Sequence, residues 1–495
     1  MKEKIDKLII NGYVLTMDNK GTIIKNGGVA VNGDKILDID KTSKIEKRYN
    51  AEYVFNAKRM VIMPGLIDTY GHAGHGMVGG FHHPSHGWPA RELYWMYSTP
   101  DWWYAEAKLA ATERLRFGTT TGTSIIGATP ARTDNPIFAY KNADAYSEVG
   151  IRGVFGVGPP DIFVPHINTP WTGGYLENGE WVKRGFTYDT ALSNACKIID
   201  KWHLGANGKV RIALNPAYIF GRPGSSTRYG YDYSDDDAKV VLEKAEEIRM
   251  YAELYGVQIH THIFRGAIDF ALDHYGRQKV DELLGPDVVI AHGNALTPSE
   301  IQTVGRNKSS VATAPSTGEN IWYGYAPVLE LLEAGANVTI STDGSAPRFS
   351  FDLWKDITRA MWNQYVKHSD MRVLPVGRTL RMVTIDAAKA LGIDDQIGSL
   401  ELGKKADIIM IDLDKPHLTP QTFIPNLLAN YVNGYDVDTV MVDGEILMES
   451  TDIKSVEVSD VLENARREAE KSYQYIDLTK YTSAEEPFWH GLRWE

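Results

Sequence analysis

Four hydrophobic runs of this sequence end in side chains that can bind a divalent metal ion. The runs are rich in Val, Ile and Leu, and the side chains at their ends are His72, His262, His292 and Asp343. Imidazole nitrogen and carboxylate oxygen form the ligand set that suits zinc or a similar transition metal ion. A hydrophobic run before such a side chain is typical of a buried strand that points it into a pocket. We therefore expect one metal site at the ends of four strands.

The elements that must position these side chains alternate between strands and helices. The first strand is expected just before His72, in a segment that includes Val61-Ile62 and residues 66–69. Further strands are predicted at residues 119–126, 152–158, 210–216, 256–262, 287–292, 311–314 and 337–341. Helical patterns separate them, and this alternation predicts a parallel α/β barrel. Both chain ends instead carry short apolar runs separated by turns, which predict an all-β module.

Five segments resemble the amidohydrolase superfamily, on the branch of cytosine deaminase and the triazine hydrolases. They are PGLIDTYGH, HTHIFR, AHGNALT, STDGSA and TIDAAKALGIDDQIGSLELGKKADIIMIDLD, and the resemblance covers roughly residues 7–449. It implies a (β/α)8 TIM-type barrel and a small β-sandwich domain built from both chain ends. The expected boundaries are 1–60 and 396–450 for the sandwich, 61–395 for the barrel, and 451–495 for a C-terminal helix and tail.

The resemblance also implies how the site works. Catalytic groups of such barrels stand at the C-terminal ends of the strands. The expected ligands are His72, His262, His292 and Asp343, and the expected ion is one zinc, with iron and manganese as alternatives. Asp343 and His292 are the expected catalytic groups, because Asp343 can accept a proton as water attacks an sp2 carbon. A single ion is expected because the fourth strand ends in Asn215 where two-metal relatives carry a lysine.

Tyr70 departs from the family pattern, which has a His-x-His pair where this chain has Tyr70-Gly71-His72. The phenol could bind the metal ion as phenolate, orient its water, or leave the position to His75. We favour a role for Tyr70 other than as a ligand. His260 lies two residues before His262 and so faces the same side one layer deeper, where packing or support of a ligand is at least as plausible as metal binding.

Arg265 is the second departure, because deaminases of this type carry His-x-x-Glu where this chain has His262-Ile263-Phe264-Arg265. Arginine cannot shuttle a proton, since it stays protonated at any working pH. It could clamp a substrate carboxylate, stabilise an oxyanion, or pair with Asp343 or Glu319. Glu319, after the seventh strand, is our candidate for the displaced acid/base role; the alternative is an ordinary loop carboxylate.

A long connection at residues 79–101 is dense in aromatic and histidine side chains. Connections of this length are commonly lids or binding loops. The expected substrate-binding residues are His82, His83, Trp88 and Trp95 of this connection, with Tyr70 and His75 before it and Trp102 just after it. The alternative is a subunit interface, where Trp and Tyr are also enriched.

Composition limits the remaining function classes. The net charge of −12 without long single-sign blocks argues against nucleic acid as a partner. No apolar stretch reaches the roughly 18 residues of a membrane span, and the N-terminus lacks a secretory signal pattern, so we expect a cytoplasmic protein without a membrane partner. The single cysteine, Cys196, excludes an internal disulfide. A homo-oligomer is expected from the resemblance.

These observations favour a metal-dependent hydrolase that cleaves a non-peptide C–N bond of a small molecule: an amide, urea, amidine or aminated ring. One alternative is a hydrolytic deaminase or dehalogenase of a nitrogen heterocycle, which Arg265 disfavours. A different class also stays open, because the changes at Tyr70 and Arg265 would suit a degenerate barrel that binds a ligand or decarboxylates it.

Overall fold

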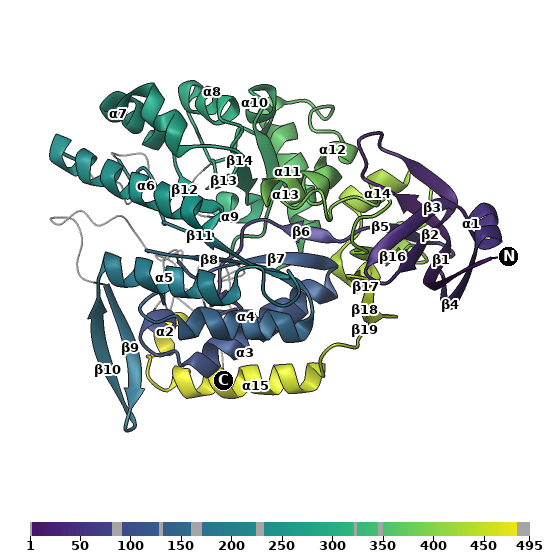
Figure 1. Ribbon diagram of the computed structural model, residues 1–495, viewed down its shortest axis with the longest axis horizontal. Helices are drawn as coiled ribbons and strands as arrows, with labels where there is room; N and C mark the ends of the chain where they lie inside the picture. Colours follow the sequence, from purple (N-terminus) through teal and green to yellow (C-terminus); the bar gives the residue numbers. More distant parts are fainter. Residues whose placement is uncertain are drawn as a thin grey trace, which may run out of the picture.

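Eight parallel strands form the centre of the molecule (Figure 1). The computed structural model describes residues 2–81, 92–127, 132–159, 171–223, 232–317, 324–344 and 350–482, and the backbone of 318–320. The strands pair in the order of the sequence. They are β6 (Leu66–Asp68), β7 (Thr119–Ile125), β8 (Arg152–Val157), β11 (Val210–Leu214), β12 (Ile259–Ile263), β13 (Val288–His292), β14 (Ser310–Thr313) and β15 (Asn337–Ile340). Seven of them lie where the hydrophobic runs predict strands, and the predicted barrel is confirmed.

The barrel closes through the residues that follow its first and last strands. The backbone N–H of Asp343 donates to the carbonyl of Tyr70 at 2.9 Å, and the N–H of His72 donates to the carbonyl of Asp343 at 3.3 Å. Gly71 and Asp343 form an isolated parallel bridge. The backbone that joins the two edges of the sheet is therefore the backbone that carries two of the expected metal ligands.

Helices cover the outside of the barrel. Figure 1 shows α7, α8 and α10 on one side of the strands and α3, α4 and α5 on the other. The helices of this layer are α3 (Pro100–Arg116), α4 (Ile137–Val149), α5 (Tyr188–Trp202), α6 (Asp235–Tyr255), α7 (Ala267–Leu283), α8 (Pro298–Arg306), α10 (Val328–Glu333), α11 (Leu353–His368), α12 (Val376–Arg381) and α13 (Ile385–Ala390). Helix α6 begins at Asp235 because Ser234 and Asp237 form a reciprocal capping box there.

Both chain ends build a second sheet beside the barrel, in purple and yellow-green at the right of Figure 1. Its nine strands are β1 (Glu3–Leu15), β2 (Ile23–Asn32), β3 (Lys35–Lys41), β4 (Tyr49–Asn56), β5 (Met60–Pro64), β16 (Ile408–Asp412), β17 (Val437–Val442), β18 (Glu445–Glu449) and β19 (Asp452–Ile453). Antiparallel pairing of β5 with β16 joins the two ends. One face packs Ile9 against Ile62 and Ile408, and the other packs Leu8 against Ile45 of α1 (Thr42–Arg48).

The first barrel strand differs from the prediction. Val61 and Ile62 belong to β5 of the second sheet, and the barrel strand β6 starts only at Leu66. Gly65 separates the two strands, and a Cβ atom there would lie 2.1 Å from Oγ1 of Thr120 in β7. The chain thus passes from one sheet to the other at a residue that must lack a side chain.

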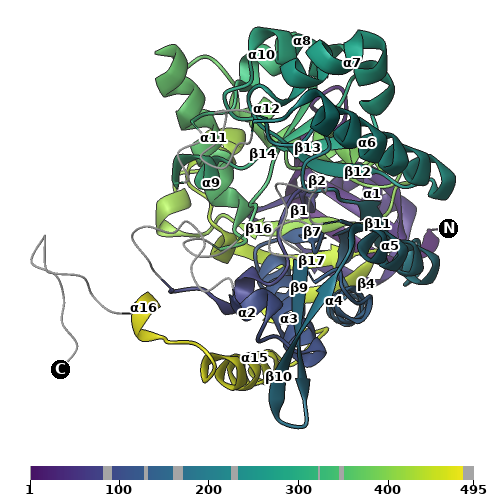
Figure 2. The same cartoon turned by 90° about the vertical axis from the view of Figure 1, so that its left-hand side faces the viewer.

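Two features lie outside the repeating pattern. A hairpin of β9 (Trp171–Glu177) and β10 (Glu180–Phe186), which follows β8 and precedes α5 in the sequence, projects from the body at the lower left of Figure 1. Near the C-terminus, α15 (Val458–Tyr473) runs beside α3, as Figure 2 shows from a second side. It is followed by α16 (Thr479–Thr482), where the hydroxyl of Tyr481 donates to Oε1 of Glu92 in α2 (Glu92–Trp95) at 2.6 Å. The hydroxyl of Tyr473 donates to the carbonyl of Met77 at 2.6 Å, so this C-terminal segment contacts the loop that follows His72.

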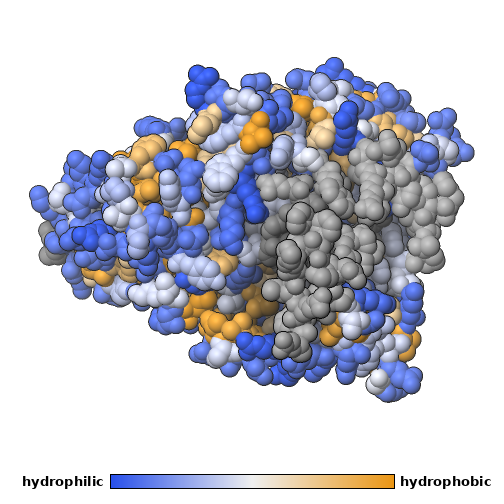
Figure 3. All heavy atoms as spheres, turned by 180° about the vertical axis from the view of Figure 1, so that it is seen from behind, coloured by the Kyte–Doolittle hydropathy of each residue, from blue (hydrophilic) through white to orange (hydrophobic). Residues whose placement is uncertain are grey.

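The described helices include none with both the length and the apolar character needed to cross a bilayer. Figure 3 shows one face of the molecule as mainly hydrophilic, with hydrophobic side chains in small groups. Single exposed apolar side chains are normal on folded proteins.

Candidate metal centre and active site

The four expected ligands stand beyond or at the ends of four barrel strands. His262 is the next-to-last residue of β12 and His292 is the last residue of β13, whereas His72 and Asp343 follow β6 and β15 by a few residues. His292 has φ of 67° and Asp343 has φ of 57°, which is the left-handed region that residues with a side chain rarely adopt. Such backbone strain clusters at functional sites, where the surrounding structure imposes it.

These four side chains converge at one place in the barrel. Nε2 of His72 lies 3.1 Å from Oδ1 of Asp343, and Nε2 of His292 lies 4.0 Å from Oδ2 of the same carboxylate. The ring of His262 has its centroid 5.3 Å from that of His292 and 6.0 Å from that of His72. All four side chains are buried. The geometry thus brings together residues that lie far apart in the sequence.

The electrostatics of the cluster favour neutral imidazoles around an ionised carboxylate. Burial alone would raise the pKa of the Asp343 carboxyl, but the neighbouring His292 and His72 imidazoles outweigh this and hold the pKa well below its usual range. Burial lowers the pKa of both His262 and His292. Neutral imidazole carries the lone pair that a metal ion requires.

The orientation of His262 follows from its two hydrogen bonds. Its Nδ1 lies 3.0 Å from the carbonyl oxygen of Ala217, which can only accept, so Nδ1 carries the proton. Nε2 therefore carries the lone pair, and the hydroxyl of Tyr70 lies 3.1 Å from it. A carbonyl that fixes the tautomer of a metal-binding histidine is a common second contact in metal sites.

Tyr70 is fully buried between these imidazoles, with its ring centroid 5.4 Å from those of both His72 and His262. Burial, followed by the charge of Asp343, raises the pKa of its phenol well above the usual value. The phenol is thus protonated and donates to His262. This arrangement supports the prediction that Tyr70 has a role other than that of a ligand.

The donor set fits a zinc ion by its chemistry, since it offers imidazole nitrogens and one ionised carboxylate in a buried site. Within the described ranges, however, no three His, Cys, Asp or Glu side chains have the spacing of a ready-made metal chelate. Two contacts already engage the expected donors: Nε2 of His72 lies 3.1 Å from Oδ1 of Asp343, and Nε2 of His262 accepts from Tyr70.

His260 lies deeper in the barrel than His262, as its position in the strand predicts. It is fully buried, and burial lowers its pKa to about 4. Its backbone carbonyl accepts a hydrogen bond from Nδ2 of Asn215 at 2.6 Å. A neutral, enclosed imidazole at this depth supports a packing role.

A buried ion pair beneath the cluster was not predicted. Arg114 of α3 donates to Oδ2 of Asp68 at 3.1 Å, and the same carboxylate accepts from Oγ1 of Thr342 at 2.6 Å and from its backbone N–H at 3.1 Å. Asp68 and Arg114 are both about 1% exposed. Asp68 therefore ties the end of β6 to the residue that precedes Asp343.

Several of the other expected site residues lie wholly or in part outside the described residues. His82, His83 and Trp88 lie outside the described residues, and Glu319 belongs to α9 (Pro315–Asn320), with its side chain outside them. Trp95 is half-buried in α2.

Trp102 corrects an expectation. It is 0% exposed and packs in the hydrophobic core against Trp103 and Tyr94, so it supports α3 and cannot form a wall for a substrate. Arg265 is solvent-exposed at the end of β12. Among the described residues the Asp343 carboxylate has its close contacts with the imidazoles of His72 and His292, so the alternative in which Arg265 pairs with Asp343 is not observed.

Two aromatic side chains beside the cluster were missed by sequence reasoning. The ring of Phe264 lies nearly parallel to those of His262 and His292, with both centroids 5.9 Å away. The ring centroid of Tyr218 lies 5.3 Å from that of His262 and 6.0 Å from that of Phe264. Phe264 directly follows β12, and Tyr218 lies four residues after the end of β11, so both stand at the strand ends where catalytic groups of such barrels gather. They form an aromatic wall next to the expected ligands.

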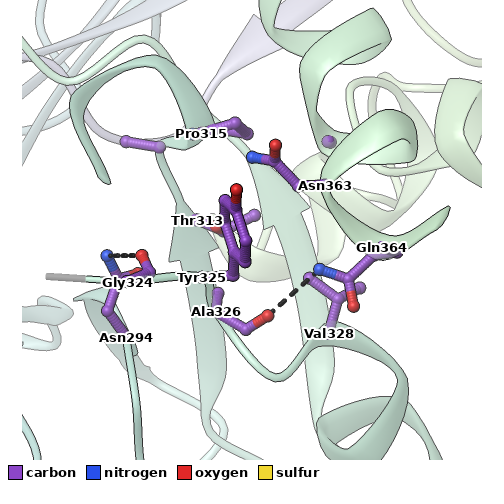
Figure 4. Close-up of a pocket in the computed structure, with 11 residues that line it drawn as sticks. Asn294, Thr313, Pro315, Gly324, Tyr325, Ala326, Val328, Asn363 and Gln364 are labelled. Carbon is purple, nitrogen blue, oxygen red and sulfur yellow. Dashed lines mark hydrogen bonds between the residues drawn. The ribbon is translucent and has the colours of Figure 1, made fainter. Parts of the chain in front are cut away.

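A small cavity lies between the end of β14 and α11 (Figure 4). Asn294 donates to the carbonyl of Gly324, and Gln364 donates to that of Ala326. The cavity holds about 10 Å³, which is room for about one water molecule, so a substrate does not fit there.

A parallel (β/α)8 barrel with histidines and a carboxylate at its strand ends is typical of metal-dependent barrel hydrolases. Residues 61–447 match the family model of the amidohydrolase family. The chain therefore belongs to the amidohydrolase family, which confirms the resemblance and the expectation of an enzyme acting on C–N bonds other than peptide bonds.

Curated relatives are similar over most of the chain. A 5'-deoxyadenosine deaminase of Methanosarcina acetivorans is 29% identical over 479 residues, which are 94% of this chain and 98% of that protein. A 5-methylthioadenosine/S-adenosylhomocysteine deaminase of Thermoanaerobacter pseudethanolicus is 28% identical over 425 residues, covering 84% of this chain and 88% of that protein.

Solved structures show the same fold. A zinc-bound adenosine deaminase of Xanthomonas campestris has a TM-score of 0.78 at 22% identity and covers 96% of this chain and 100% of its own. A zinc-bound atrazine chlorohydrolase mutant of Arthrobacter aurescens has a TM-score of 0.76 at 21% identity and covers 94% and 100%. These two likenesses concern the fold alone.

Proposed function

We propose that the protein is a hydrolase with one zinc ion that cleaves a C–N bond at an sp2 carbon of a nitrogen heterocycle and releases ammonia or an amine. The observation that carries the proposal is the convergence of three histidines on the ionised carboxylate of Asp343 at the carboxyl end of the barrel. Iron or manganese would use the same donors.

The metal ion would be held by His72, His262, His292 and Asp343, and when bound it supplies a Lewis acid that makes water a nucleophile near neutral pH. Asp343 accepts a proton from the attacking water at a carboxylate oxygen, since its low pKa keeps it ionised. The proton then passes to the departing nitrogen as the C–N bond breaks. Nε2 of His292 lies 4.0 Å from this carboxylate, so His292 would hold the ion next to the group that accepts the proton.

The substrate class we propose is an aminated purine or a similar flat heterocycle. Support comes from the flat faces of Phe264 and Tyr218 beside the cluster, which suit a planar ring. The names of the relatives point in the same direction. Trp95 and the residues His82, His83 and Trp88 complete the proposed substrate-binding set.

Arg265 and Glu319 have proposed roles at the rim of the site. The exposed guanidinium of Arg265 at the end of β12 would bind an anionic group of the substrate. Glu319 would serve as the second acid/base group. Its helix α9 is held in place by Asp356 of α11, whose carboxylate accepts from the backbone N–H of Ser316 at 3.0 Å.

The test combines metal analysis with an assay for ammonia. Protein purified without chelator should contain about one zinc per chain and should release ammonia from one of a panel of adenosine, 5'-deoxyadenosine, 5-methylthioadenosine and aminated triazines. Asp343→Asn and His292→Ala should lower turnover by about 10²–10⁴-fold while the circular dichroism spectrum is unchanged. Wild-type turnover in these variants would contradict the proposal.

A second candidate is a barrel that binds a ligand without metal-assisted hydrolysis. It is favoured by one contact, the hydrogen bond from Tyr70 to Nε2 of His262, which engages a lone pair that a metal ion would need. The same metal analysis separates the two candidates, because a metal content far below one equivalent in active-site-intact protein supports this second function.

The proposal includes a cytoplasmic location and assembly into a homo-oligomer. The half-buried free thiol of Cys196 is compatible with a reducing compartment. Trp362, Tyr431 and Tyr435 expose 57%, 54% and 67% of their surface, and exposed aromatics are enriched at subunit interfaces. Light scattering of the purified protein measures the number of chains.

A further inference from the structure

The loop after β6 brings one more imidazole to the cluster. His75 begins the short helix η1 (His75–Met77), and its ring stacks on that of His72 with centroids 5.0 Å apart and planes 21° apart. The side chain is 0% exposed. It thus lies in the site, three residues after His72.

Gly344 makes the room that His75 occupies. A Cβ atom on Gly344 would lie 1.6 Å from Nδ1 of His75, which no side chain could tolerate. Because Gly344 directly follows Asp343, the imidazole of His75 reaches the backbone beside that carboxylate.

The backbone around His75 is held from below by Glu106 of α3. Oε1 of Glu106 accepts from the backbone N–H of Gly76 at 3.0 Å, and the carboxylate also interacts with the N–H of Gly74. Glu106 is 1% exposed. Gly74 has φ of 88°, and a Cβ atom there would lie 2.6 Å from the ring of Tyr94. A buried carboxylate below and a tyrosine ring beside it therefore fix the direction of His75.

We propose that His75 is a ligand of the metal ion, in place of the imidazole that the chain lacks at Tyr70, and that Glu106 is the positioning residue that holds it there. This inference rests on the proposed function, because it requires a bound ion. It explains how a centre in which Tyr70 engages His262 still offers enough imidazoles to hold zinc.

The first experiment measures zinc affinity by competition with a chromophoric chelator, and records the visible absorption spectrum after replacement of zinc by cobalt. His75→Ala and His75→Gln should each weaken zinc binding by at least about 10–100-fold. Both should also change the cobalt spectrum, because the number of nitrogen ligands falls. His203→Ala is the control, since His203 caps α5 and donates nothing to the cluster.

The second experiment tests the positioning role of Glu106. Glu106→Gln keeps the shape of the side chain but weakens its hydrogen bonds with the backbone N–H groups of Gly74 and Gly76. The substitution should lower zinc affinity about threefold to tenfold. Glu300→Gln is a matched control: Glu300 is also buried and accepts from backbone N–H groups, those of Ile268 and Thr297, but belongs to α8.

The outcomes separate this inference from the proposed function. If wild-type protein binds zinc and Asp343→Asn abolishes binding, while both His75 variants keep wild-type affinity and cobalt spectrum, His75 is not a ligand and only this inference is overturned. If wild-type protein binds no zinc, the proposed function fails and this inference with it. If Glu106→Gln behaves like Glu300→Gln, the role of Glu106 is overturned.

Discussion

The hydroxyl of Tyr70 lies 3.1 Å from Nε2 of His262, the nitrogen that carries the lone pair of that ring. One lone pair cannot serve a phenol proton and a metal ion at the same time. Tyr70 and the metal ion therefore compete for His262, and the strength of this hydrogen bond opposes metal binding.

Tyr70→Phe should consequently raise zinc affinity. A net hydrogen bond is worth about 1 kcal/mol, which corresponds to roughly fivefold in a binding constant. Chelator competition measures the change, and Tyr188→Phe, at a buried tyrosine of α5, is the control. Weaker binding in Tyr70→Phe would mean that the phenol assists the ion instead of competing with it.

Asp68→Asn should destabilise the fold severely, because it leaves Arg114 charged and buried without its carboxylate. Loss of one partner from a buried pair costs about 3–5 kcal/mol of unfolding free energy. Urea denaturation measures this loss. Asp236→Asn, which removes an exposed pair with Lys239, should leave stability unchanged. Equal stability of wild type and Asp68→Asn would show that the pair contributes little.

Asp356 should make stability depend on pH. Burial raises the pKa of its carboxyl from 3.8 to about 7. As pH rises, the Asp356 carboxyl therefore ionises at lower pH in the unfolded chain than in the folded one. The stability of the wild type relative to Asp356→Asn is thus greatest below about pH 4 and falls between pH 4 and pH 7. The total loss is on the order of 4 kcal/mol. Urea titrations at several pH values measure the difference between the two proteins, and a constant difference would contradict the prediction.

Phe264→Ala should impair substrate binding more than chemistry. The ring lies parallel to His262 and His292 and offers a flat surface beside them. Loss of one aromatic contact is worth about 0.5–1.5 kcal/mol, so KM should rise roughly twofold to tenfold with kcat nearly unchanged. Steady-state kinetics with an aminopurine nucleoside measure both, and Phe423→Ala, at an exposed site, is the control. A lower kcat at constant KM would place Phe264 in the chemical step.

The barrel could be predicted because its signal is repeated. Strands such as 288–292 are buried along their whole length, so each reads as an uninterrupted apolar run. The hairpin of β9 and β10 was missed although a signal exists. Its turn is Asn178-Gly179, and both residues have positive φ, as a two-residue hairpin turn requires.

Only part of the site could be predicted from the sequence. His262 and His292 are visible there because each closes a strand. The pair of Asp68 with Arg114 depends on how α3 packs against β6, which no local pattern encodes. The same holds for Glu106 and the loop at Gly74–Gly76, since the contact joins segments that only the folded barrel brings together.

Strand β5 pairs on one side with β1 and on the other with β16, so that Val61 faces Ile411 across some 350 intervening residues. During synthesis at about 5–20 residues per second, β5 is complete tens of seconds before its partner strand β16 has been made. Over that time the edge of β5 that will pair with β16 is unpaired. That edge is a template for pairing with other unfinished chains. The yield of soluble protein should therefore rise with additional chaperones and at lower expression temperatures, where translation is slower. We expect this rise to be larger than the stability of the folded protein alone would suggest.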